Sequence, residues 1–80
     1  MAKEKNNFKI MLISMMDAYR LFRGNIRITN IPEFTRFVSC SWEVSRSAWL
    51  ILLKNESFDD IPFGQQYPVF PAEFEEIKKA

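Results

Sequence analysis

Residues 38–45 alternate between apolar and polar side chains, and this alternation constrains the fold more than any other feature of the sequence. A strand with one buried and one solvent-exposed face has this pattern, because successive side chains point to opposite sides of a sheet. The apolar set is Val38, Cys40, Trp42 and Val44. Residues 48–53 then form an unbroken apolar run, which is typical of a central strand covered on both faces. With residues 45–47 as the connection, the pattern predicts an antiparallel hairpin over about residues 37–54.

Residues 8–23 have a helical period instead. The stripe at i, i+4, i+7, i+11 and i+14 consists of Phe8, Leu12, Met15, Tyr19 and Phe22. Asn6 or Asn7 can cap the start of this helix, and Gly24 suits the left-handed position just past its end. We therefore expect an N-terminal helix packed on the sheet, preceded by a flexible segment at residues 1–7. Apolar side chains cover well over half of its circumference, so this helix is also a candidate homodimer interface.

The rest of the chain predicts shorter elements. Residues 25–29 alternate and favour a short strand, whereas residues 55–71 are rich in turn-forming Pro, Gly and Asp. This long loop carries too many apolar anchors for a disordered segment. The anchors are Phe58, Ile61, Phe63, Tyr67, Val69 and Phe70. Pro71 suits the first turn of a short C-terminal helix over residues 72–79, with acidic residues early and lysines late. We therefore predict one small α+β domain over residues 1–80.

The composition narrows the chemistry. The chain has 80 residues, a net charge of +1, no histidine and one cysteine, Cys40. Without histidine, imidazole acid–base catalysis and the zinc sites built from Cys and His are excluded. Cys40 lies on the apolar face of the predicted strand, so we expect a buried, inert thiol. We expect no enzymatic activity, and therefore no catalytic residue, no metal site and no cofactor.

Two further patterns concern the compartment. Lysines precede the apolar residues 10–16, but Asp17 closes this run and no small-x-small cleavage site follows, unlike a secretory signal. The other apolar run, residues 48–53, is far shorter than the roughly 20 residues of a membrane-spanning helix. A lone cysteine excludes an internal disulfide framework and fits a reducing compartment. We therefore expect a cytoplasmic protein, in the host cell if a virus encodes the chain.

The near-zero net charge conceals a polarity along the chain. Residues 1–54 carry nine lysines and arginines against four carboxylates, or +5, and residues 55–80 carry two against six, or −4. This favours an acidic tail that folds back on the arginine-bearing half. Alternatively, the arginines bind an acidic protein or a phosphate group. An exposed tryptophan would add an anchor. The candidate partner-binding residues are Arg20, Arg23, Arg27, Arg36, Arg46 and Trp49.

A second reading places helices in the middle of the chain. Residues 44–54 read VSRSAWLILLK and residues 61–69 read IPFGQQYPV. The first segment resembles the recognition helix of excisionase-type winged helix-turn-helix proteins, the second is similar to their wing hairpin, and residues 72–79 resemble the helix that follows. The resemblance implies a mostly α fold that binds DNA. In this sequence the positively charged residues that would contact the DNA are Arg36, Arg46 and Lys54.

Three observations favour the hairpin over that family's fold. Leu50 and Ile51 occupy positions where the family exposes basic or polar groups to DNA. Gln65 and Gln66 replace the usual basic pair of the wing. The serines and valines within residues 38–47 are also indifferent helix formers. We therefore prefer the α+β fold and keep the mostly α winged helix-turn-helix fold as the alternative.

The expected function follows from what remains. A small chain with surplus apolar and arginine-bearing surface is expected to bind another protein. Compact, cysteine-poor chains of this kind are frequent among phage and mobile-element accessory proteins, which suggests a regulator or inhibitor of a larger host protein or complex. The partner would present an acidic or apolar surface, or be a second copy of the chain. Nucleic acid is the alternative partner, and no membrane partner is expected.

Overall fold

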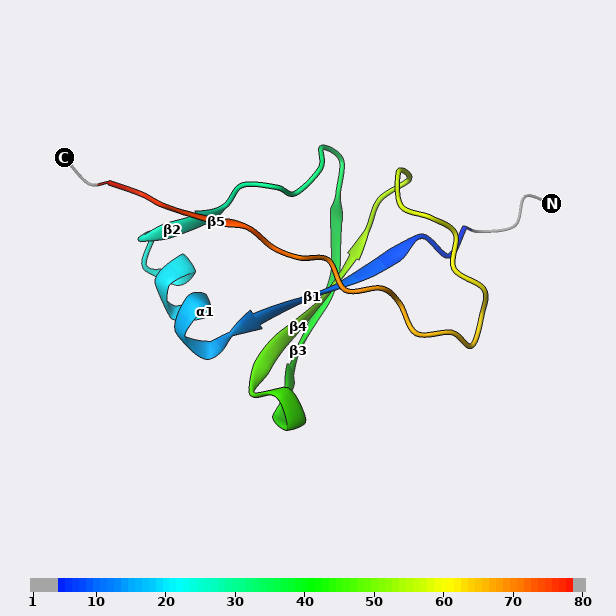
Figure 1. Cartoon of the computed structure of the whole chain (residues 1–80), viewed down its shortest axis with the longest axis horizontal. Helices are drawn as coiled ribbons and strands as arrows, with labels where there is room; N and C mark the ends of the chain where they lie inside the picture. Colours follow the sequence, from blue (N-terminus) through cyan, green and yellow to red (C-terminus); the bar gives the residue numbers. More distant parts are fainter. Residues whose placement is uncertain (1–4, 79–80) are drawn as a thin grey trace.

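The computed structural model describes residues 5–78, which contain two antiparallel sheets and one α-helix (Figure 1). The elements are β1 (Phe8–Ser14), α1 (Met15–Phe22), β2 (Ile26–Ile28), β3 (Arg36–Glu43), the 3-10 turn η1 (Val44–Arg46), β4 (Ala48–Lys54) and β5 (Phe74–Glu76). The larger sheet has the order β1-β4-β3, and β2 pairs with β5. The small α+β fold is confirmed. The helices expected over residues 8–23 and 72–79 are not found as such, and the mostly α alternative is wrong.

The hairpin of β3 and β4 lies where the alternating pattern predicted it. Trp42 is directly opposite Trp49, and their rings meet edge to face with centroids 5.3 Å apart. The connecting residue Ser47 adopts a left-handed conformation with φ of 48°, and its N–H donates to the carbonyl of Val44. β4 is the central strand of the sheet, as its apolar character on both faces predicted.

The first half of the expected N-terminal helix is a strand. β1 runs antiparallel to β4, from Phe8 opposite Lys54 to Ser14 opposite Ala48. Residues 10–13 are all apolar, so they satisfy a strand period as well as a helical one. Pairing with β4 decides between the two, because it buries Met11 and Ile13 almost completely and hydrogen-bonds the second edge of β4.

α1 begins at Met15, seven residues later than the pattern indicated, and Ser14 caps it. The Ser14 Oγ accepts a hydrogen bond of 3.1 Å from the N–H of Asp17, which is the usual N-terminal cap. At the other end, Gly24 takes a left-handed φ of 76°, as predicted. The N–H groups of Gly24 and Asn25 donate to the carbonyls of Leu21 and Arg20, so the C-terminal cap is a Schellman motif.

Asn6 and Asn7 belong to the segment expected to be flexible, and both form hydrogen bonds to distant residues; residues 1–4 lie outside the described part. Asn6 donates from its N–H to Asp60 Oδ1 and from its side-chain amide to the Ile61 carbonyl, each at 2.7 Å. The hydroxyl of Tyr67 donates to Asn6 Oδ1. Both asparagines are buried. They hold the loop after β4 and do not cap a helix.

The expected C-terminal helix is the strand β5. Its residues pair with β2, with Glu75 directly opposite Arg27. Backbone hydrogen bonds extend this pairing beyond both ends of the two strands. The N–H of Thr29 donates to the backbone carbonyl of Glu73, and the N–H of Ile77 donates to the backbone carbonyl of Asn25. A helix of eight residues is marginal in water, whereas this pairing supplies β2 with its only neighbour within residues 5–78. Lys79, the last lysine of the expected helix, lies outside the described residues.

The segment before β5 covers the outer edge of β1. Val69 forms a parallel bridge to Ile10. The N–H of Ile10 donates to the carbonyl of Pro68, and the carbonyl of Ile10 accepts from the N–H of Phe70. In Figure 1 this segment, drawn in orange, meets and crosses β1 near the middle of the strand. Among the predicted loop anchors, Phe58 and Phe70 are buried as expected, whereas Phe63 and Val69 are exposed. The long loop is thus ordered but anchored by fewer residues than the sequence suggested.

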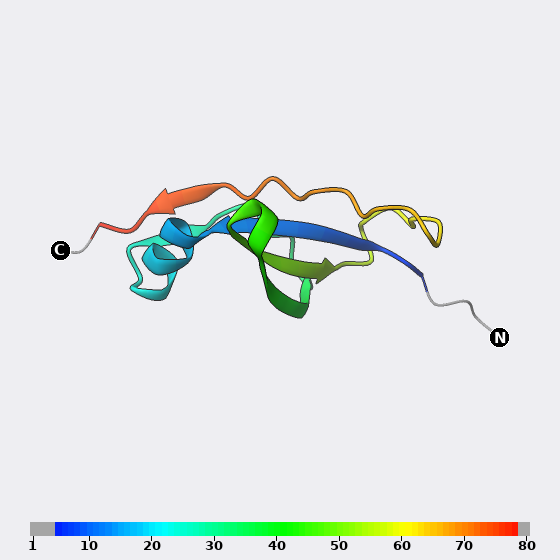
Figure 2. The same ribbon diagram turned by 90° about the horizontal axis from the view of Figure 1, so that it is seen from below.

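The core is a thin layer on one side of the sheet. Its buried members are Met11, Ile13, Leu53, Phe58 and Phe70. Partly buried side chains of α1 and of residues 28–31 pack around them. The molecule measures 52 × 30 × 16 Å along its principal axes, and Figure 2 shows how flat it is. A body this thin has room for the sheet and one covering layer, so much apolar surface stays at the outside.

Asn55 joins the end of β4 to the loop before β3. Its buried side chain donates to the Glu33 carbonyl and to Thr35 Oγ1, and accepts from the N–H and hydroxyl of Ser57. We predict that Asn55→Ala lowers the free energy of unfolding by about 2–3 kcal/mol, because it leaves buried polar groups without partners. Urea titrations followed by tryptophan fluorescence will measure the change.

Asn30→Ala is the matched control. Asn30 also bridges two chain segments, donating to the Pro71 carbonyl and accepting from the N–H of Glu73, but both bonds are exposed. Water replaces exposed bonds, so we expect a loss below about 1 kcal/mol. Equal losses in the two variants would show that Asn55 has no special role.

Candidate protein-binding surface

The larger sheet has one face that carries the core. Residues directly opposite one another in a sheet point to the same face. Met11 lies opposite Ile51, and Ile51 lies opposite Cys40, so all three share a face. This core face comprises Lys9, Met11 and Ile13 of β1, Trp49, Ile51 and Leu53 of β4, and Phe37, Cys40 and Trp42 of β3. It extends from the covered strands to the edge of the sheet.

A β-bulge decides which residues of β3 reach the core face. The register with β4 shifts between Phe37 and Ser39, so Val38 is an extra residue there. The strict alternation predicted from the sequence grouped Val38 with Cys40 and Trp42. The bulge changes this grouping, because one inserted residue reverses the face of everything before it. Phe37 therefore joins the core face.

The core face is covered over β1 and open over β3. Trp42 and Trp49 are each 37% exposed, Phe37 is 60% exposed, and Cys40 is exposed as well. The expectation that Cys40 is buried is therefore wrong, since the covering layer ends before it reaches β3. We call Phe37, Cys40, Trp42 and Trp49 the tryptophan surface.

An apolar hollow adjoins the tryptophan surface. It is lined by Ile13, Ala18, Cys40, Trp49 and Ile51, and none of these side chains carries a charge or a hydrogen-bonding oxygen or nitrogen apart from the Trp49 indole. Ala18 belongs to α1, so the hollow lies where the helix meets the sheet. An apolar side chain from another molecule fits such a site better than a polar one, because the lining offers no partner for a polar group.

α1 presents a second apolar surface. Ala18 and Leu21 face the core, while the outward residues Met15, Met16, Tyr19 and Phe22 are exposed. Apolar residues on more than one face of this segment were predicted from its helical period. Only the second half of that segment is helical, so the exposed set is smaller than the period implied.

Two of the candidate arginines are engaged by the acidic tail. Arg20 Nη2 lies 3.1 Å from Glu76 Oε1, and Arg27 Nη2 lies 3.0 Å from Glu75 Oε2. The expectation that the tail folds back on the arginine-bearing half is confirmed for these pairs. Arg23 donates instead to the hydroxyl of Tyr19, at 2.9 Å. All three side chains thus have partners inside the chain.

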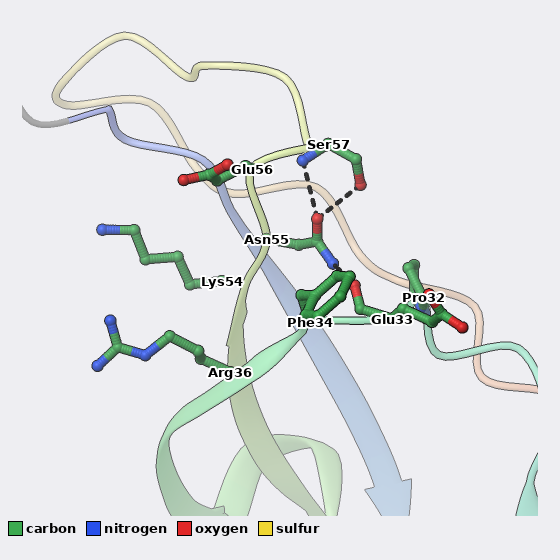
Figure 3. A pocket seen from close by; sticks show the side chains of 8 residues that line it. All are labelled: Pro32, Glu33, Phe34, Arg36, Lys54, Asn55, Glu56 and Ser57. Atoms are coloured by element: carbon green, nitrogen blue, oxygen red, sulfur yellow. Dashed lines mark hydrogen bonds between the residues drawn. The ribbon is translucent and has the colours of Figure 1, made fainter.

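Arg36 and Lys54 form an unusual like-charge pair. They are directly opposite on β3 and β4, and within residues 5–78 neither forms an ion pair. Figure 3 shows the two side chains extending in the same direction from a hollow that Phe34 also lines. Like charges opposite one another destabilise a sheet. Phe34 is 92% exposed with a left-handed φ of 65°, which is unfavourable for a bulky residue.

The remaining candidates lie at the opposite end of the hairpin. Arg46 is exposed in η1, and Trp49 follows at the start of β4. The fold therefore brings Arg36 to Lys54, Arg46 to the end occupied by the two tryptophans, and Arg20 with Arg27 to the acidic tail. Sequence reasoning missed Phe37 as a surface residue, because the bulge that turns it to the core face depends on pairing with β4.

Within residues 5–78 no three potential metal-ligating side chains gather together, and no helix is long and apolar enough to cross a membrane. The chain matches no protein-family model, no curated protein and no solved structure with which it was compared.

The ion pairs between the arginines and the tail are exposed, so their contribution to stability is small. We predict that the double variant Arg20→Gln, Arg27→Gln loses less than about 1 kcal/mol of unfolding free energy at low salt. The loss shrinks at high salt, because mobile ions screen exposed charges. Urea titrations at two salt concentrations will measure both effects.

Arg23→Gln is the control, since its partner is the neutral Tyr19 hydroxyl and its effect is expected to vary less with salt. A large loss in the double variant that persists at high salt would contradict this interpretation and give the ion pairs a structural role.

Proposed function

We propose that this chain is a small non-catalytic protein-binding module of the cytoplasm, a regulator or inhibitor that binds a larger protein through the tryptophan surface. The observation that carries the proposal is the exposed edge-to-face pair of Trp42 and Trp49 beside an apolar hollow. Tryptophan is the residue most enriched among interface hot spots, and contiguous exposed apolar patches mark binding sites.

The chemistry of the surface also describes the partner. An apolar side chain of the partner would fill the hollow between Ala18 and Trp49. Arg46 lies at the same end of the hairpin and forms no ion pair within residues 5–78, but it lines a hollow with Glu43 and Leu50 of the opposite face. An acidic group on the partner would therefore pair with it only where the partner reaches around the end of the hairpin. Ion pairs at a rim mainly guide association, whereas the buried apolar contact supplies most of the affinity.

The DNA-binding alternative loses its main support. It requires a recognition helix over residues 44–54, and these residues form η1 and β4. Arg36 and Lys54 do lie together, but Arg46 is at the far end of the hairpin. We therefore rank protein binding first.

The proposal is tested by capturing partners on the immobilised chain and measuring their affinity after purification. We expect Trp49→Ala to weaken binding by about tenfold or more, because it removes the anchor beside the hollow. Phe63→Ala is the matched control, since Phe63 is also an aromatic residue and is more exposed than Trp49, but it lies in the loop after β4. It is expected to leave affinity unchanged.

Two results would contradict the proposal. One is a captured partner whose affinity is the same for the wild type and a folded Trp49→Ala variant, with folding checked by circular dichroism. The other is steeply salt-dependent retention on duplex DNA, which would indicate phosphate contacts and revive the alternative.

A further inference from the structure

The outer edge of β3 is the free edge of the larger sheet. β4 is central, and the outer edge of β1 is covered by the bridge between Ile10 and Val69. Within residues 5–78 no strand pairs with the outer side of β3. Its eight residues are exposed except for Glu43, which is half-buried. A long exposed edge with unpaired backbone groups is a template for another strand.

The sequence of β3 has charges of opposite sign at its two ends. It begins at Arg36 and ends at Glu43, and neither side chain forms an ion pair within residues 5–78. Arg36 is instead opposite Lys54, which is an unfavourable neighbour. Two copies of such a strand, placed antiparallel, bring each Arg36 to a Glu43.

The faces of β3 allow this pairing. Paired residues must share a face, and the core face holds Phe37, Cys40 and Trp42, while the other face holds Arg36, Ser39, Ser41 and Glu43. With a two-fold axis between the two Cys40 residues, Ser39 lies opposite Ser41 of the second copy. Val38 is the extra residue of the bulge, so Phe37 then lies opposite Trp42 and Arg36 opposite Glu43.

This register is favoured over its neighbours. A shift by two residues in one direction leaves Arg36 without an opposite residue, and a shift in the other direction leaves Glu43 without one. Only the register centred on Cys40 pairs aromatic with aromatic on one face and cation with carboxylate on the other. Because the bulge removes one residue from the pairing, the two partners of each pair lie on the same face of the joined sheet.

We propose that two copies of the chain pair antiparallel through β3, related by a two-fold axis at Cys40, and form one continuous sheet of six strands. The interface is isologous, so each contact occurs twice. Each Glu43 neutralises an Arg36, which relieves the repulsion with Lys54. The core face continues across the dimer, and both tryptophan surfaces stay accessible, since edge pairing covers no face.

The charge pairs provide the sharpest test, by sedimentation equilibrium from micromolar to millimolar concentration. Arg36→Glu alone and Glu43→Arg alone each create two like-charge pairs in a homodimer, so we expect the dissociation constant to rise by about tenfold or more. An equimolar mixture of the two variants restores both pairs and is expected to dimerise as the wild type does. Arg46→Glu and Ser45→Ala are controls, for the change of charge and for the Ser45 hydroxyl bond to Glu43.

Cys40 supplies an independent readout. Opposite Cα atoms in an antiparallel pair are about 4.5–5.5 Å apart, a distance that a disulfide spans. Diamide, which takes up the two protons and two electrons released by two thiols, is expected to convert the wild type to a covalent dimer. Crosslinking is expected to be slower in Arg36→Glu, whereas Cys40→Ser keeps the non-covalent dimer.

Two outcomes would overturn the proposal. One is a wild-type chain that stays monomeric up to millimolar concentration. The other is a dimer that Phe22→Ser dissociates and the charge variants leave intact, because that result places the contact on α1. Arg36 lies on the face opposite to the tryptophan surface, so Arg36→Glu is expected to leave partner binding unchanged, and a failure of this proposal is distinguishable from a failure of the proposed partner binding.

Discussion

The pairing of β4 with a strand on each side is the interaction on which the rest of the structure depends. β4 is apolar on both faces, so it is stable only when neighbours flank it and side chains cover at least one face. β1 and β3 supply the neighbours. The other elements attach to this unit: α1 begins where β1 ends, and the segment around Val69 bonds to the outer edge of β1.

The thin covering layer explains why a stable fold still exposes so many large apolar residues. Phe58, Phe70 and α1 cover β1 and the adjoining side of β4, and nothing described extends that layer over β3. A chain of this size buries a smaller fraction of its surface than a larger domain does. Part of the uncovered surface is on α1 and in the loops, and part is on the hairpin, where Phe37, Trp42 and Trp49 share one face. Neighbouring exposed residues on one face distinguish a binding surface from scattered apolar residues.

The sequence carries enough information for the hairpin and the charge pairing, but not for the paths of both ends. The alternation of residues 38–44 and the two-faced run after it are local signals, and the opposite charges of Arg27 and Glu75 are visible without a structure. Residues 10–13 fit two periods, and only β4 decides between them. Residues 74–76 read locally as part of a helix, yet their partner is a strand 48 positions earlier. The bulge at Val38 exists only in relation to β4, so no local pattern reveals it.

The contacts that join the two ends have a consequence for how the chain is made. Tyr67 donates to Asn6 across 61 positions, and Arg20 meets Glu76 across 56. The ribosome releases the N-terminal residues first, so β1 leaves it long before β4 and the covering segment exist. The native sheet therefore forms only after β4 and the covering segment have left the ribosome, as is typical of folds built on distant pairings. Until then the apolar β1 segment is the part of the nascent chain most in need of protection by chaperones.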